Sequence, residues 1–223
     1  MLKQVHAYVA RKSWFAGDDA AALAAELGRI SKFQSLKSED AVTWSWFGTL
    51  ALAEPEDRRA AIQWLYERLD LGLTATTGVQ IDQWMRVIHP NAPQSPNGPE
   101  LDARIDDPGG ALIYVEAKWD AVLGTGKGRH EGTKDDQVLL RRSALRTEPA
   151  LAHDKRDFVV MGVSNASPDL AIYTEPQQQP PLRPVAVAWL TWDDLADCDA
   201  HPRAGEFRCY LAWKRELTQS PGR

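Results

Sequence analysis

The sequence predicts an α/β (α+β) domain built around one mixed central β-sheet. Two observations lead to this prediction. Apolar residues in the first third of the chain recur at helical spacing, whereas from Val79 onwards they alternate with polar residues, as in half-buried strands. In the second half, further strand patterns are separated by helical ones, which is typical of a sheet covered by helices.

The first third is expected to be helical. The second of its helices follows Ser38 and has an acidic first turn, which suits the helix dipole. The third begins at Pro55, a residue favoured at the first helical position. The three expected helices span residues 20–33, 39–52 and 56–70.

From Val79 the chain is expected to form five strands and two more helices. The strands are predicted over 79–89, 100–106, 111–117, 157–164 and 185–192, and the helices over 135–146 and 206–217. We treat 1–223 as a single domain. Its core spans about 38–164, with an N-terminal helical part over 1–37 and a C-terminal strand and helix extension over 185–217.

Composition narrows the classes of function. The formal net charge is −5, so no overall cationic field favours nucleic acid, and such a role needs a local basic surface. Cys198 and Cys209 lack metal-ligand spacing, which favours a reduced, cytoplasmic chain. No stretch approaches the ~20 apolar residues of a membrane span, and the N-terminus has no signal-peptide pattern.

A short β-hairpin is expected to bring charged side chains together. The Pro-Gly-Gly sequence at 108–110 predicts a three-residue turn, so that Asp107 pairs with Ala111. Counting back along both strands sets Asp102 opposite Glu116, with Cβ atoms roughly 5 Å apart. A two-residue turn would instead place the two carboxylates on different faces.

The faces of this hairpin are expected to differ in polarity. Lys118 shares the face of Glu116, because side chains alternate along a strand. The other face of each strand is apolar and is expected in the core: Leu101, Ala103, Ile105, Ile113, Val115 and Ala117.

Two carboxylates and an ammonium on one patch have a chemical use. Mg²⁺ relieves the repulsion between neighbouring carboxylates by binding oxygen atoms of both. The metal can activate a water and stabilise charge on a phosphate under attack. Lys118 can orient or deprotonate that water, or neutralise negative charge. The alternative is a solvated hairpin face with a Glu100–Lys118 ion pair.

Leu101 and Asp102, followed on the next strand by Glu116, Ala117 and Lys118, resemble the motif of the PD-(D/E)XK nuclease superfamily, with its restriction-endonuclease-like fold. Leu101 stands where the proline of that name would be. The resemblance covers about 38–164 and implies an αβββαβ core. It also implies that Asp102 and Glu116 bind metal and that Lys118 serves catalysis.

The resemblance implies a Mg²⁺-dependent nuclease, with Mn²⁺ as a substitute, that hydrolyses phosphodiester bonds in DNA, most simply as an endonuclease. Members often add an acid from the first core helix. Glu39 fits best as this further metal ligand and catalytic residue, with Asp40 and Glu54 as alternatives. Gln137 stands where members often carry a Gln or Lys on the following helix, and it is expected to contact nucleic acid. Basic residues near the site are expected to contact phosphates: Lys127, Arg129, Lys134 and Arg141.

Other interpretations stay open at this stage. The same fold without chemistry would be an inactive module that binds nucleic acid or a protein partner. A glycine-rich loop at 124–128 allows a phosphate-transferring enzyme, although it lacks the P-loop pattern. RNA as substrate and a homodimer are also open. The tryptophans, among them Trp44, Trp46 and Trp119, are expected in the core rather than as base-stacking platforms.

Overall fold

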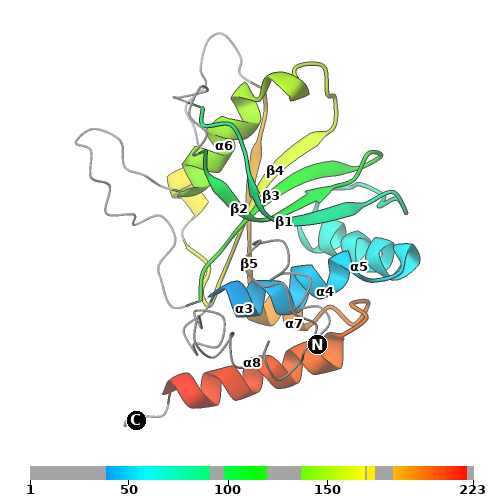
Figure 1. Cartoon of the computed structure of the whole chain (residues 1–223), viewed down its shortest axis with the longest axis vertical. Coiled ribbons are helices and arrows are strands. Elements are labelled where there is room, and N and C mark those ends of the chain that lie inside the picture. Colours follow the sequence, from blue (N-terminus) through cyan, green and yellow to red (C-terminus); the bar gives the residue numbers. More distant parts are fainter. Residues whose placement is uncertain (1–38, 91–97, 120–136, 169, 174–182, 220–223) are drawn as a thin grey trace, which may run out of the picture.

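The computed structural model describes residues 39–90, 98–119, 137–168, 170–173 and 183–219. Five strands form one open sheet, in which they lie in sequence order: β1 (Gln80–Arg86), β2 (Glu100–Asp106), β3 (Ala111–Ala117), β4 (Asp157–Ser164) and β5 (Ala186–Thr191). β1, β2 and β3 are antiparallel neighbours, whereas β3, β4 and β5 run parallel (Figure 1). The predicted mixed α/β sheet is confirmed.

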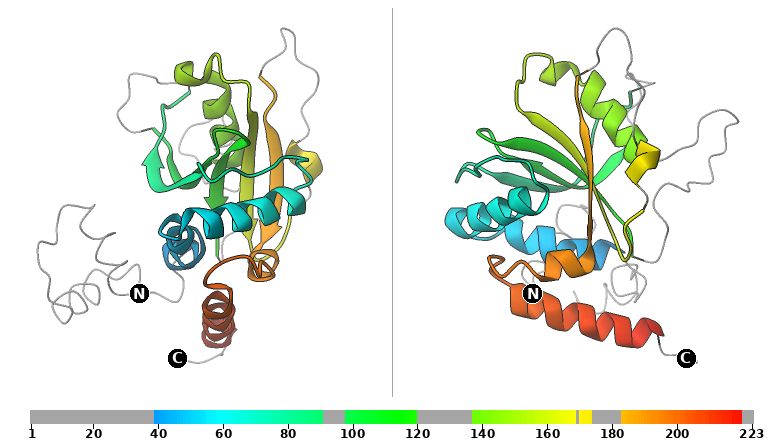
Figure 2. Two further views of the ribbon diagram at one scale, coloured as in Figure 1. Left: turned by 90° about the vertical axis from the view of Figure 1, so that its right-hand side faces the viewer. Right: turned by 180° about the vertical axis from the view of Figure 1, so that it is seen from behind.

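Helices lie on both sides of the sheet (Figures 1 and 2). One side carries α6 (Gln137–Thr147), which connects β3 to β4. The other side carries the remaining α-helices, with α8 outermost: α3 (Glu39–Thr43), α4 (Thr49–Ala51), α5 (Pro55–Arg68), α7 (Trp192–Ala196) and α8 (Ala204–Gln219). None of the helices in the described ranges is long and apolar enough to cross a membrane.

The two faces of β3 enter two separate hydrophobic clusters. Ile113, Val115 and Ala117 pack on the side of α5 and α8. Leu112 and Tyr114 pack on the side of α6, against residues such as Val138 and Leu145. All seven residues of β3 are therefore buried, as is usual for a central strand covered on both faces. The predicted division of this strand into two faces is confirmed.

The turn between β2 and β3 has the predicted length. The backbone N–H of Asp107 donates to the carbonyl of Ala111 at 3.1 Å, which closes a turn over residues 108–110. Further along the ladder, Ala103 pairs with Val115. Gly110 is required here, because a Cβ atom at this position would lie 2.5 Å from the hydroxyl oxygen of Tyr66.

The prediction for the apolar face of β2 was wrong at one residue. Leu101 belongs to the cluster on the α6 side, whereas Ala103 and Ile105 pack on the opposite side. On β1, the residue between the paired Gln83 and Met85 is Trp84, whose φ of 52° lies in the left-handed region. The strand alternation is therefore interrupted where β1 passes Asp102.

The helix expected over 39–52 is divided. A π-helical turn, Trp44–Gly48, separates α3 from α4. Gly48 permits this arrangement, since a Cβ atom there would lie 2.1 Å from the Trp44 ring. Trp44 is half-buried and stacks on Trp84 with ring centroids 5.7 Å apart, so the prediction that it lies in the core was wrong. Trp46 and Trp119 are in the core, as predicted.

The remaining predicted elements lie close to their expected bounds. The strand expected over 185–192 ends at Thr191, because Thr191 and Asp194 form a capping box that starts α7. The closing helix is longer than predicted and spans Ala204–Gln219. The helix expected over 20–33 lies outside the described residues.

Candidate active site

Asp102 and Glu116 lie on neighbouring strands where β2 and β3 leave their shared ladder. The ladder pairs Ala103 with Val115, and one further pair in the same register sets Asp102 opposite Glu116. Here a side chain takes the place of a backbone carbonyl as hydrogen-bond acceptor. The backbone N–H of Ala117 donates to Asp102 Oδ2 at 2.7 Å. The carboxylate is therefore turned toward β3.

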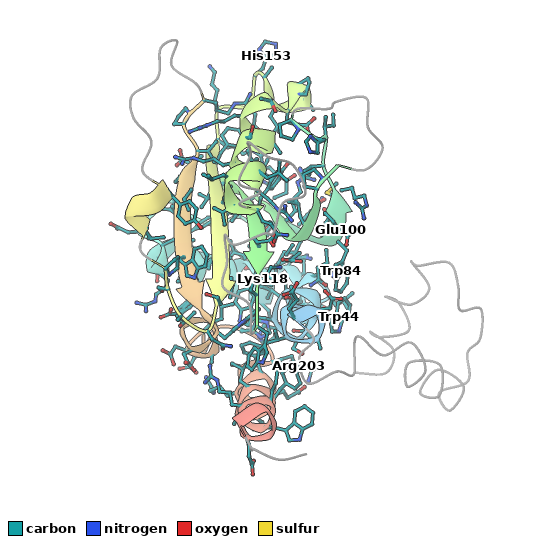
Figure 3. All side chains as sticks on the ribbon, turned by 90° about the vertical axis from the view of Figure 1, so that its left-hand side faces the viewer. Trp44, Trp84, Glu100, Lys118, His153 and Arg203 are labelled. Atoms are coloured by element: carbon teal, nitrogen blue, oxygen red, sulfur yellow. The ribbon has the colours of Figure 1, made fainter. Side chains whose placement is uncertain are left out.

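Lys118 connects an acid of the sheet to an acid of a helix. Its Nζ lies 3.0 Å from Glu116 Oε1 and donates to Glu39 Oε1 at 2.9 Å. Its backbone N–H donates to the carbonyl of Val163 on β4 at 2.8 Å, so the lysine is held by the sheet on its main-chain side. Figure 3 shows Lys118 where the end of β3 approaches α3. Strand and helix thus meet through one ammonium group.

Arg141 of α6 completes the set of charges. Its Nη2 lies 2.7 Å from Glu116 Oε2 and donates to the backbone carbonyl of Glu100 at 2.6 Å. Its side chain is only 7% exposed, and that of Glu116 only 1%, so this ion pair is buried. Glu116 therefore has a cation at each of its two oxygen atoms.

The charges in this cluster shift one another's pKa values. Burial, and then the negative charge of Glu116, raise the pKa of Asp102 to about 8. Burial acts in the opposite sense on Lys118 by disfavouring its charged form. The carboxylates of Glu116, Asp102 and Glu39 outweigh that effect, and the pKa of Lys118 is raised above its usual range. At neutral pH we therefore expect a protonated Asp102 beside an ammonium.

Four residues expected at the site are brought together: Glu39, Asp102, Glu116 and Lys118. Of the acids considered for the first helix, Glu39 reaches Lys118, whereas Glu54 is exposed at the start of α5. The alternative Glu100–Lys118 pair is not formed, since Glu100 lies 3.3 Å from Arg86.

The expected phosphate-binding residues have different positions. Gln137 is the first residue of α6 and is half-buried. Lys127, Arg129, Lys134 and the glycine-rich loop at 124–128 lie outside the described residues. Arg141 was expected to face nucleic acid, and its contact with Glu116 was not foreseen. One signal was available: Arg141 follows Gln137 by four residues, so the two share a helix face.

The donor atoms suit a hard divalent cation, but they are not arranged as a finished metal site. Mg²⁺ prefers carboxylate oxygens, which Glu39, Asp102 and Glu116 supply. Within the described ranges, however, no three acid, histidine or cysteine side chains are grouped closely enough to hold a metal ion. Lys118 and Arg141 lie among the acids and balance their charge instead.

Comparison with known proteins returned no relatives: no protein family, no curated protein and no solved structure matches this chain. The functional assignment therefore depends on the residues of the site.

Proposed function

We propose that this chain is a divalent-metal-dependent nuclease that hydrolyses phosphodiester bonds in DNA, of the PD-(D/E)XK kind. The observation on which this proposal depends is the placement of Asp102 opposite Glu116, with Lys118 joined to Glu116 at 3.0 Å. The order of elements supports it as well, because a helical segment precedes three antiparallel strands, followed by α6 and the parallel strand β4.

Each residue has a role that its position suggests. Asp102, Glu116 and Glu39 would hold Mg²⁺, with Mn²⁺ as a substitute. When bound, the ion supplies an activated water and neutralises charge on the phosphate. Lys118 keeps its proton because the neighbouring acids, Glu116 above all, raise its pKa, so its role is to neutralise charge that develops on the phosphate. Removing a proton from water is the less suitable of its two expected roles.

One observation favours a second candidate, an inactive module that uses this fold to bind nucleic acid or a protein. Both oxygen atoms of Glu116 already contact cations, Lys118 at 3.0 Å and Arg141 at 2.7 Å. Such a cluster is electrically satisfied without metal, as a purely structural ion network would be.

A cleavage assay separates the two candidates. The purified chain is incubated with linear, circular and single-stranded DNA, with and without Mg²⁺. We expect Mg²⁺-dependent cleavage by the wild type, loss of cleavage in Glu116→Gln and Asp102→Asn, and no change in Glu206→Gln, an exposed acid on α8. Binding of DNA without cleavage under any metal condition would favour the inactive module.

A further inference from the structure

Arg141 ties α6 to two strands at the candidate site. The same nitrogen, Nη2, lies 2.7 Å from Glu116 Oε2 on β3 and donates to the carbonyl of Glu100 on β2 at 2.6 Å. Its side chain is almost entirely withdrawn from solvent. A guanidinium is always charged, so this position holds a permanent positive charge against Glu116.

A metal ion that binds Glu116 meets a cation at either carboxylate oxygen. Glu116 is buried, and its other oxygen, Oε1, lies 3.0 Å from Lys118. An oxygen atom that binds a divalent cation cannot keep a guanidinium at 2.7 Å, because the two positive charges repel each other strongly away from water. Binding of metal by Glu116 therefore requires one of the two cations to withdraw.

The contacts indicate which cation withdraws. Lys118 has a second acidic partner, Glu39 at 2.9 Å, and its main chain is bound into the sheet through Val163. The second partner of Arg141 is a neutral backbone carbonyl, that of Glu100. Arg141 also has the longer side chain and approaches from a helix on the far side of the cluster. Arg141 therefore loses less favourable interaction energy than Lys118 would when it leaves Glu116.

From these contacts we infer that Arg141 is a built-in competitor of the metal ion for Glu116, so that metal enters only as the guanidinium withdraws. This inference depends on the proposed function. The released guanidinium keeps its charge and its planar donor groups, which match a phosphate group. Its ion pair with Glu116 and its expected contact with nucleic acid are then two alternative states of one side chain.

Direct titration with Mn²⁺ tests this competition without any measurement of activity. Calorimetry on the full chain compares the wild type with Arg141→Gln, which keeps polarity and removes the competing charge. We expect the variant to bind Mn²⁺ about tenfold more tightly or more, because a buried ion pair no longer has to be broken. Arg141→Lys, which keeps a charge but loses the planar group, should lie between the two.

Arg142 provides a matched control on the same helix. It is also buried, but it donates to the backbone carbonyls of Val185 and Tyr173, at 3.2 and 2.7 Å. Arg142→Gln should therefore lower stability without changing Mn²⁺ affinity. Circular dichroism confirms that each variant is folded before titration, and Arg141→Lys takes the place of Arg141→Gln if the latter does not fold.

Two outcomes would contradict the inference in different ways. If the wild type binds Mn²⁺ and removal of the Arg141 charge leaves the affinity equal or weaker, competition is wrong while the metal site stands. If no protein in the series binds Mn²⁺, including the wild type, the proposed metal-dependent function fails and the inference fails with it.

Discussion

The hydroxyl of Tyr66 donates a hydrogen bond of 3.0 Å to Asp107 Oδ2, directly beneath the turn that joins β2 to β3. The same hydroxyl oxygen accepts the backbone N–H of Ala111 at 3.0 Å. Asp107 is fully buried and accepts two further hydrogen bonds from Thr76. The backbone N–H of Thr76 donates to Asp107 Oδ2 at 3.1 Å, and the Thr76 hydroxyl donates to Asp107 Oδ1 at 2.5 Å. A helix and a loop therefore fix the turn whose length sets the register of Asp102 and Glu116.

Loss of the Tyr66 hydroxyl should weaken this anchor. Tyr66→Phe leaves the ring in place but removes one donor from Asp107 and the acceptor of the Ala111 amide. We expect the free energy of unfolding to fall by about 1–3 kcal/mol, the cost of leaving buried polar groups without partners. Urea denaturation measures it. Tyr210→Phe is the control, because the Tyr210 hydroxyl is not part of this network, and it should lower the free energy of unfolding by less. Equal decreases in both variants would show that the hydrogen bonds of Tyr66 do not stabilise the turn.

The raised pKa of Asp102 predicts a pH-dependent stability of the metal-free protein. The folded chain keeps this proton up to about pH 8, whereas the unfolded chain loses it near the ordinary value of 3.8. Between these values the folded state binds the extra proton, so this contribution to stability decreases as pH rises, by at most about 1.4 kcal/mol per pH unit. Urea melts in EDTA should show wild type losing stability relative to Asp102→Asn from pH 5 to 8. Parallel curves over that range would show that Asp102 is ionised throughout.

Lys118 should matter for turnover more than for binding. Lys118→Ala removes the charge that stabilises the transition state, and we expect kcat to fall by about 100- to 1000-fold or more, the range seen when one such donor is lost. DNA affinity should be preserved, and metal affinity should not fall, because Lys118 is no longer held against two of the proposed metal ligands. Lys118→Arg should fail as well, because a planar guanidinium is larger than the ammonium held between Glu39 and Glu116.

The control for this experiment is Lys155→Ala, an exposed lysine outside the site. Cleavage kinetics and a DNA-binding titration on all three variants separate turnover from affinity. Wild-type turnover by Lys118→Ala would remove the residue from the proposed mechanism.

The left-handed backbone of Trp84 predicts that glycine is more stabilising than alanine at this position, the reverse of their order within a helix. Trp84→Gly and Trp84→Ala both remove the ring that stacks on Trp44, but a φ of 52° is strained for alanine and not for glycine. The glycine variant should be more stable by about 1 kcal/mol. At Trp64, within the helix α5, the same pair should show alanine ahead by about the same amount. Alanine ahead at both positions, in denaturant melts, would contradict a left-handed Trp84.

The site could be predicted as far as it depends on strand alternation and turn length. Asp107 and Ala111 close the turn as expected. Counting residues back from this pair along both strands is enough to place Asp102 opposite Glu116. Glu39 was predictable only through the family resemblance, since no local rule joins it to Lys118 across 79 residues of sequence.

Other features depend on contacts that a sequence does not display. Leu101 changes face near a residue, Trp84, whose backbone conformation tryptophan rarely adopts and which tertiary packing must impose. The sequence over 39–52 has a regular helical pattern, and nothing in that pattern predicts the π-helical turn that ends at Gly48. Arg141 belongs to a basic run that usually faces solvent, and its burial follows only from how α6 lies across Glu116.

The hydrogen bond from the Ala117 amide to Asp102 has a consequence for hydrogen exchange. This amide proton is protected by a titratable side chain, whereas the next one, on Lys118, is protected by the β4 carbonyl of Val163. Exchange at Lys118 therefore follows the opening of the sheet, and exchange at Ala117 follows movement of one carboxylate. The ratio of the two exchange rates is an internal probe of the site, which reports on Asp102 without substrate or mutation.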